Sequence, residues 1–136
     1  MKYLAMAIAI LLLPVLFAYV YFVTPSVYVE TSARGVSIHC EVLRDYPSDI
    51  GRIEIREMAS GMVVWSVRAQ GSKFQLHKFD LTRGWNADTL QPSFGRFDTD
   101  VPRRGPFYLR PGTGYQASIC SSAPLSICRT ASFTLR

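Results

Sequence analysis

The sequence has few of the residues that carry metal and nucleophilic chemistry. Its 136 residues include three cysteines and two histidines. His39 and His77 stand alone, without the closely spaced partners that a zinc site requires. No serine lies in a G-x-S-x-G pattern, and no glycine-rich stretch has the spacing of a phosphate-binding loop. We therefore expect a protein that is not an enzyme and that holds neither a metal nor a cofactor.

One short acidic segment offers the remaining alternative of this kind. Asp98 and Asp100, with Asp88 nearby, carry oxygens that suit a hard cation. Arginines at 96, 103 and 104 stand close to these carboxylates in the sequence, so we expect a solvated, neutralised loop. A small metal-binding or enzymatic domain is therefore the less favoured reading of the chain.

Long runs of one charge are also lacking. The chain carries 15 basic and 10 acidic residues, and the two signs alternate. Nucleic-acid binding would require a basic stripe or a known binding motif, and the sequence has neither, so no nucleic acid is expected as a partner. The small positive excess permits weak attraction to anionic lipids or polyanions.

A long apolar run is present at the N-terminus. Tyr3 to Val23 contains no charge and no glycine, and it is long enough as a helix to cross a bilayer core of about 30 Å. Tyr19, Tyr21 and Phe22 lie at its far end, where aromatic rings favour the interface. We expect residues 1–25 to form a membrane anchor that binds lipid. Lys2 favours a cytoplasmic N-terminus, which leaves residues 26–136 outside the membrane, in the periplasm if the cell is bacterial.

A cleaved signal peptide is the alternative to a retained anchor. Signal peptides have an apolar core of about 7–15 residues, followed closely by a small-x-small cleavage site. The apolar run here is longer, and its best site, Thr31-Ser32-Ala33, lies well beyond it. Retention, as an anchor or an uncleaved signal, is therefore the favoured prediction.

The remaining sequence is typical of short antiparallel strands. Alternating apolar and polar residues predict half-buried strands in several segments. These segments are 26–31, 36–42, 52–56, 62–67 and 74–81. Arg44 to Gly51 is predicted as a loop because it is rich in turn-forming residues. The parity of the apolar residues changes between Leu76 and Phe79, which predicts a β-bulge.

The strand pattern stops between Thr82 and Pro106. A long irregular loop of this kind is often functional in a compact domain. It contains Trp85, Phe94 and Phe97, and aromatic side chains on loops can anchor protein interfaces. These three residues are the candidate partner-binding residues, although an aromatic side chain here can equally cover an edge of the domain.

The C-terminal part begins with a turn whose residues have defined roles. Pro111 fixes its own φ, and Gly112 accepts a positive φ, so the pair favours a tight turn. Leu109 precedes this turn and Tyr115 follows it at the start of a strand. A buried Tyr115 would place its hydroxyl on upstream backbone, as in a tyrosine corner. These four residues are predicted to form a structural corner.

The run L-x-P-G-T-x-Y, followed by two strands that end near Leu135, resembles the last two strands of fibronectin type III domains. The resemblance implies an all-β, immunoglobulin-like antiparallel sandwich and carries no activity. Those domains usually have a tryptophan on their second strand, whereas this chain has His39 and Cys40 there.

Strand register gives a test for the cysteines. If Cys120 faces Cys128 in a hairpin, then Tyr115 faces Phe133, and inward residues meet inward residues. A Cys120–Cys128 disulfide is therefore favoured. Cys40 shares the parity of inward residues and is expected in the core. A Cys40–Cys120 bridge between sheets, or no bridge, are the alternatives.

These predictions together indicate a membrane-anchored extracytoplasmic interaction module. It would act as an accessory subunit of a larger envelope or membrane complex and contact another protein. The alternative from another class is a secreted ligand- or glycan-binding domain, released after cleavage of the apolar segment.

Overall fold

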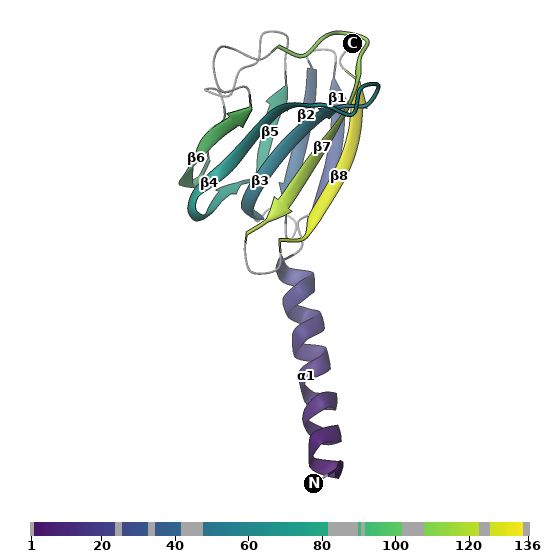
Figure 1. Cartoon of the computed structure of the whole chain (residues 1–136), viewed down its shortest axis with the longest axis vertical. Helices are drawn as coiled ribbons and strands as arrows, with labels where there is room; N and C mark the ends of the chain where they lie inside the picture. The colour runs from purple at the N-terminus through teal and green to yellow at the C-terminus, as the bar shows by residue number, and fades with distance from the viewer. Residues whose placement is uncertain are drawn as a thin grey trace.

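The computed structural model describes residues 2–23, 26–32, 35–41, 48–81, 90, 92–101, 108–122 and 126–134. Within these residues one helix precedes eight strands (Figure 1). The elements in chain order are α1 (Lys2–Val23), β1 (Ser26–Ser32), β2 (Gly35–Glu41), β3 (Ser48–Glu57), β4 (Val63–Leu76), β5 (Lys78–Leu81), β6 (Phe94–Val101), β7 (Gly114–Ser121) and β8 (Cys128–Thr134).

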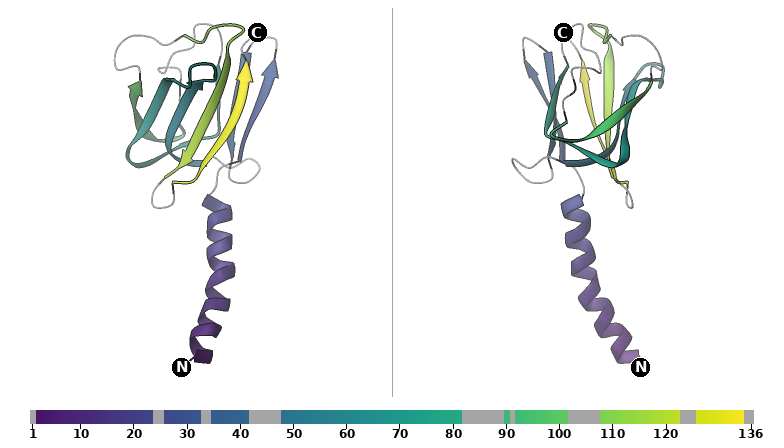
Figure 2. Two further views of the ribbon diagram at one scale, coloured as in Figure 1. Left: turned by 45° about the vertical axis from the view of Figure 1, so that its right-hand side comes forward. Right: turned by 90° about the vertical axis from the view of Figure 1, so that its left-hand side faces the viewer.

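The strands form two antiparallel sheets. Three strands pair in the order β1-β2-β5, and five pair in the order β6-β4-β3-β7-β8. The two sheets lie face to face, as the two further views in Figure 2 show. The predicted all-β antiparallel sandwich with one N-terminal apolar helix is therefore confirmed.

The core lies between the two sheets and follows the predicted alternation. On β2 the inward residues Val36, Ile38 and Cys40 are at most 2% exposed. Trp65 on β4 is fully buried, and its ring lies 6.5 Å from the ring of Phe79 on the opposite sheet. Because both sheets supply large apolar side chains, burial in this layer is the main stabilising term of the fold.

The chain passes from one sheet to the other at His77, and this corrects the predicted bulge. Leu76 ends β4 in the five-stranded sheet, and Lys78 begins β5 in the three-stranded sheet. The Cys40 amide donates to the His77 carbonyl oxygen at 2.7 Å, which holds the crossing point against β2. Because the strand changes sheet, inward-facing residues change parity there, and Phe74 and Phe79 reach the same core from opposite sides.

The predicted loop from Arg44 to Gly51 is also partly wrong, because β3 already begins at Ser48. Ile50 pairs with Phe74 on β4 and with Ser121 on β7, and its side chain is fully buried. Burial of Ile50 outweighs the local turn preference of its neighbours. Gly51 belongs to the same strand. A Cβ there would lie 3.0 Å from the Ser121 carbonyl oxygen, so the close approach of β7 favours glycine at this position.

The predicted loop from Thr82 to Pro106 is also partly wrong, because it contains the strand β6. This strand pairs with β4 at the edge of the five-stranded sheet. Most of its side chains are exposed, so the sequence lacks the alternation that marks a half-buried strand. Backbone pairing with β4 forms this strand, and that information is absent from its own sequence.

The long axis of the molecule runs from α1 to the far end of the sandwich (Figure 1). We call the end of the sandwich beside α1 the helix-side end; β1, β3, β5 and β8 begin there and β7 ends there. The far end carries the β3–β4 turn and the turn before β7. This direction decides which residues lie near the apolar helix.

Candidate functional site

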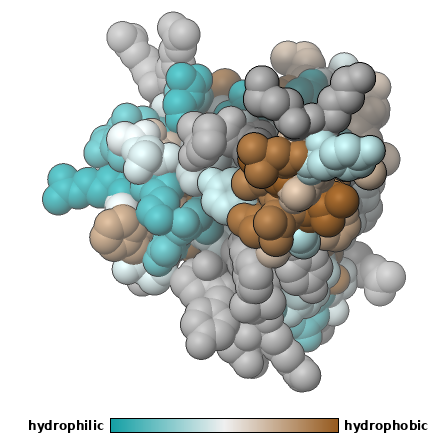
Figure 3. Space-filling view, turned by 90° about the horizontal axis from the view of Figure 1, so that it is seen from below, coloured by the Kyte–Doolittle hydropathy of each residue, from teal (hydrophilic) through white to brown (hydrophobic). Residues whose placement is uncertain are grey.

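The apolar helix is the most conspicuous surface of the chain. Tyr3–Val20 is long and apolar enough to cross a membrane. The side chains from Tyr3 to Tyr19 are exposed, and Val20 is half-buried. Figure 3, seen from below, shows hydrophobic side chains gathered over α1 against more polar side chains of the sandwich. A helix that is apolar on all sides is stable only when an apolar environment surrounds it.

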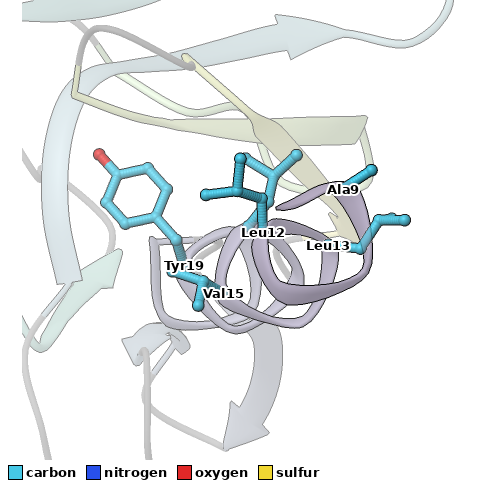
Figure 4. Close-up of a pocket in the computed structure, with 6 residues that line it drawn as sticks. Ala9, Leu12, Leu13, Val15 and Tyr19 are labelled. Atoms are coloured by element: carbon cyan, nitrogen blue, oxygen red, sulfur yellow. The ribbon is translucent and has the colours of Figure 1, made fainter. Parts of the chain in front are cut away.

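One face of α1 carries a shallow apolar groove of about 560 Å³. Its lining comes from α1 alone, and Figure 4 shows these side chains along the helix. The lining residues are Ala9, Leu12, Leu13, Val15, Leu16 and Tyr19. Pro14 lies on the opposite side at 100° per residue, and a proline bends a helix away from its own ring. The groove therefore occupies the concave side of the helix.

The three candidate partner-binding aromatics do not share one environment. Phe94 begins β6 and is 60% exposed. Phe97 is half-buried and packs against the core, with its ring 5.7 Å from that of Phe74. Trp85 lies outside the described residues. Among the described residues, Phe94 therefore remains available to a partner, whereas Phe97 has a packing contact.

The predicted corner residues lie together at the far end. Tyr115 and Leu109 are buried, at 2% and 6% exposure. The Arg110 amide donates to the Tyr115 hydroxyl oxygen at 2.9 Å. Gly112 has a φ of 76°, with nothing near its missing Cβ, so its role is conformational freedom.

A disulfide joins β7 to β8 at the helix-side end. Cys120 and Cys128 are bonded, and the same register places Tyr115 opposite Phe133. Cys40 is free and fully buried. Burial, followed by the nearby charge of Glu41, raises the pKa of the Cys40 thiol far above its usual value. This buried thiol is therefore unsuited to nucleophilic chemistry.

The structure also assembles a polar cluster on the outer face of the three-stranded sheet, the His39 cluster. It consists of Tyr28, Glu30, His39, Glu41 and His77. The rings of Tyr28 and His39 stack with centroids 4.5 Å apart. His39 Nε2 lies 3.3 Å from Glu30 Oε2, and His77 Nε2 lies 3.4 Å from Glu41 Oε1. Tyr28 donates to that same Glu41 oxygen at 3.4 Å.

Strand pairing creates this cluster, which the sequence did not predict. Tyr28 pairs with His39 across β1 and β2, and His77 lies beside β2 at the sheet crossing. His39 and His77 are therefore neighbours in space, with ring centroids 6.5 Å apart. No group of three His, Cys, Asp or Glu side chains among the described residues can hold a metal ion. Glu41, whose side chain is only 12% exposed, accepts a hydrogen bond from Tyr28 and lies beside both imidazole rings in this cluster.

A second carboxylate with several partners, Asp49, lies at the helix-side end, and its side chain is partly exposed. Asp49 accepts hydrogen bonds from Lys73 Nζ and Gln75 Nε2, both at 2.7 Å. Burial acts to raise the pKa of Asp49, but these hydrogen bonds and the lysine charge outweigh it and lower the pKa. Asp49 is therefore an ionised, occupied carboxylate.

Comparison with known proteins adds no family assignment. No protein-family model matches the sequence, and no curated protein is significantly similar to it.

Proposed function

We propose that this protein is a single-pass, membrane-anchored interaction module whose sandwich lies on the extracytoplasmic side. In this role it is an accessory subunit of a larger membrane complex. The helix binds lipid, whose acyl chains fill the apolar groove, and the sandwich contacts a protein. Lys2 supports a cytoplasmic N-terminus.

The position of β1 is the main support for the proposal that the anchor is retained and not cleaved. The best cleavage site for a signal peptidase, at residues 31–33, overlaps the end of β1. Cleavage there would remove a strand that pairs with β2 at all seven of its residues. It would also remove Val27 and Val29, which pack against the core. A secreted domain produced by this cleavage would thus lose a strand, which favours the anchored form.

The fibronectin type III-like identity of the sandwich is part of the proposal. It is supported by the buried Tyr115 hydroxyl bonded to backbone upstream of its strand. The division of the strands into sheets of three and five also suits this class of two-sheet domain. Domains of this class serve many binding functions, so the partner must be found from the surface.

The protein-contact surface is proposed to include Phe94 on the edge strand β6. An exposed aromatic side chain on a rigid strand loses little conformational entropy on binding. Trp85, which precedes β6 in the sequence, is the second proposed contact.

The anchor is tested by fractionation of cells that express the full chain. We expect the intact chain to stay in the membrane pellet after carbonate and high-salt washes. Mass measurement should give the full-length mass. A soluble species beginning near Arg34 would instead establish the secreted alternative and overturn the anchored form.

The protein contact is tested with a matched pair of variants on one strand. Phe94→Ala should leave the melting temperature nearly unchanged and reduce the yield of one crosslinked partner after detergent extraction. Phe97→Ala should lower the melting temperature because Phe97 packs on Phe74. Unchanged crosslinking for both Phe94→Ala and Trp85→Ala would refute this contact surface.

A further inference from the structure

The helix-side end of the sandwich is held close to the bilayer by a short connection. Two residues separate Val23 at the end of α1 from Ser26 at the start of β1. Three Cα–Cα steps of about 3.8 Å span at most about 11 Å. If α1 spans the membrane, as in the proposed function on which this inference rests, this end must face the lipid headgroups.

Exposed cations lie at this end of the molecule. Lys78 is the first residue of β5, and Arg129 is the second residue of β8; both are exposed. Both strands begin at the helix-side end (Figure 1). His77, the residue at which the chain crosses between the sheets, adds an imidazole, and its side chain is 41% exposed.

The described carboxylates at the same end are already occupied. Asp49 is bonded to Lys73 and Gln75. Glu41 is 12% exposed at its side chain and faces Tyr28 and both histidines of the His39 cluster. Glu30, 70% exposed at its side chain, lies farther along the same face and contacts His39. Among the described residues, Lys78 and Arg129 form no ion pair, so both cations are available to an external ligand.

We propose that Lys78 and Arg129 bind the phosphates of anionic lipids in the bilayer that α1 spans. Each cation close to an anionic membrane surface strengthens the attraction about fivefold. His77 lies beside Lys78 and lines the same surface. The contact fixes the orientation of the sandwich on the membrane and so presents its far end and its β6 edge to partners in solution.

Lipid is the favoured occupant because this surface continues directly from the apolar helix. Beside the connection, a protein partner would have to enter a space limited to about 11 Å. Phe94 also lies toward the helix-side end, since it pairs with Gln75, but on the sheet edge opposite β8. The far end has no such restriction, since it lies across the whole sandwich from α1 (Figure 2).

The test uses amine labelling, because Lys2, Lys73 and Lys78 are the lysines of the sequence. The full chain is placed in nanodiscs of phosphatidylcholine alone or with 30% phosphatidylglycerol, and acetylation of Lys78 is followed by mass spectrometry. We expect acetylation to be several-fold slower with phosphatidylglycerol, and 0.5 M salt should remove the difference because salt screens the attraction. Oxidation of Met58 and Met62, exposed in the β3–β4 turn at the far end, should be the same in both lipids.

Matched arginine variants make the test specific. Arg129→Gln should weaken the lipid-dependent protection of Lys78, because one of the two proposed phosphate contacts is lost. Arg110→Gln removes an exposed arginine from the far-end turn and should leave the protection intact. Equal Lys78 labelling in both lipids, or equal effects of the two variants, would overturn the inference. Loss of the chain from the bilayer under carbonate would instead overturn the proposed anchor, so the two failures are distinguishable.

Discussion

The backbone amide of Arg110 donates a hydrogen bond to the hydroxyl oxygen of Tyr115 at 2.9 Å. The ring of Tyr115 is buried and stacks on Phe133, with centroids 5.7 Å apart. The Tyr115 hydroxyl thus acts as a hydrogen-bond acceptor. The other way to form such a corner would be for the hydroxyl to donate to a backbone carbonyl. Its partner is a donor that the turn leaves without a strand neighbour. One side-chain atom therefore connects the turn to the core of β7 and β8.

Tyr115→Phe tests this connection. The variant keeps the ring and removes the acceptor of a part-buried amide, so the free energy of unfolding should fall by about 1–3 kcal/mol. Urea unfolding measures the change. Tyr108→Phe is the control, because Tyr108 is 58% exposed and should change stability by less than about 0.5 kcal/mol. Equal effects of the two variants would mean that Tyr115 is not a corner residue.

Removal of the disulfide should weaken the fold without abolishing it. The bond closes a short loop, with a sequence separation of eight residues, so the chain-entropy account predicts a loss somewhat below about 3 kcal/mol for C120S/C128S. Backbone pairing continues along the hairpin to Gly114 and Thr134, which keeps β8 in the sheet. Thermal unfolding with and without reductant gives the measurement. Peptide mapping that places Cys40 in a bridge would contradict the assignment.

Gly95 and Gly71 form a matched pair for a substitution to alanine. Both have a positive φ, at 79° and 86°, which costs about 1–2 kcal/mol for a residue with a Cβ. A Cβ on Gly71 meets nothing within 4 Å, whereas one on Gly95 would lie 2.7 Å from the Lys73 carbonyl oxygen. Gly95→Ala should therefore destabilise the protein clearly more than Gly71→Ala. Hydrogen exchange should show that the additional loss is concentrated in β6, and equal losses would refute the close approach.

Stability should depend on pH through Asp49. Its pKa in the folded protein is below its ordinary value of about 3.9, so the ionised carboxylate stabilises the fold at neutral pH. This contribution should decrease as the pH falls below about 4 and through the folded pKa. Asp49→Asn should cost less than about 1 kcal/mol at pH 7, since both Asp49 and Lys73 are partly exposed. The difference from the unchanged protein should shrink as the pH falls through the folded pKa of Asp49; a difference that grows on acidification would contradict this assignment.

Local patterns determined much of the architecture. The apolar run defines α1, because its length and lack of charge are properties of the sequence itself. The alternation of apolar and polar residues predicted β2 and the β3–β4 hairpin, since every second residue in these segments faces the core. The pairing of Cys120 with Cys128 followed from register, because the side-chain period of a strand is two.

The tertiary structure decided the features that depend on distant neighbours. β6 is a strand because β4 offers it hydrogen bonds, and its own exposed residues carry no periodic signal. The change of parity at His77 marks the passage of the chain from one sheet to the other. The local sequence pattern is the same for such a passage and for a β-bulge within one strand. His39, Glu41 and His77 meet because strand pairing and the crossing bring separate segments together. Periodicity reports which face a residue takes, whereas pairing between distant segments decides which residues share that face.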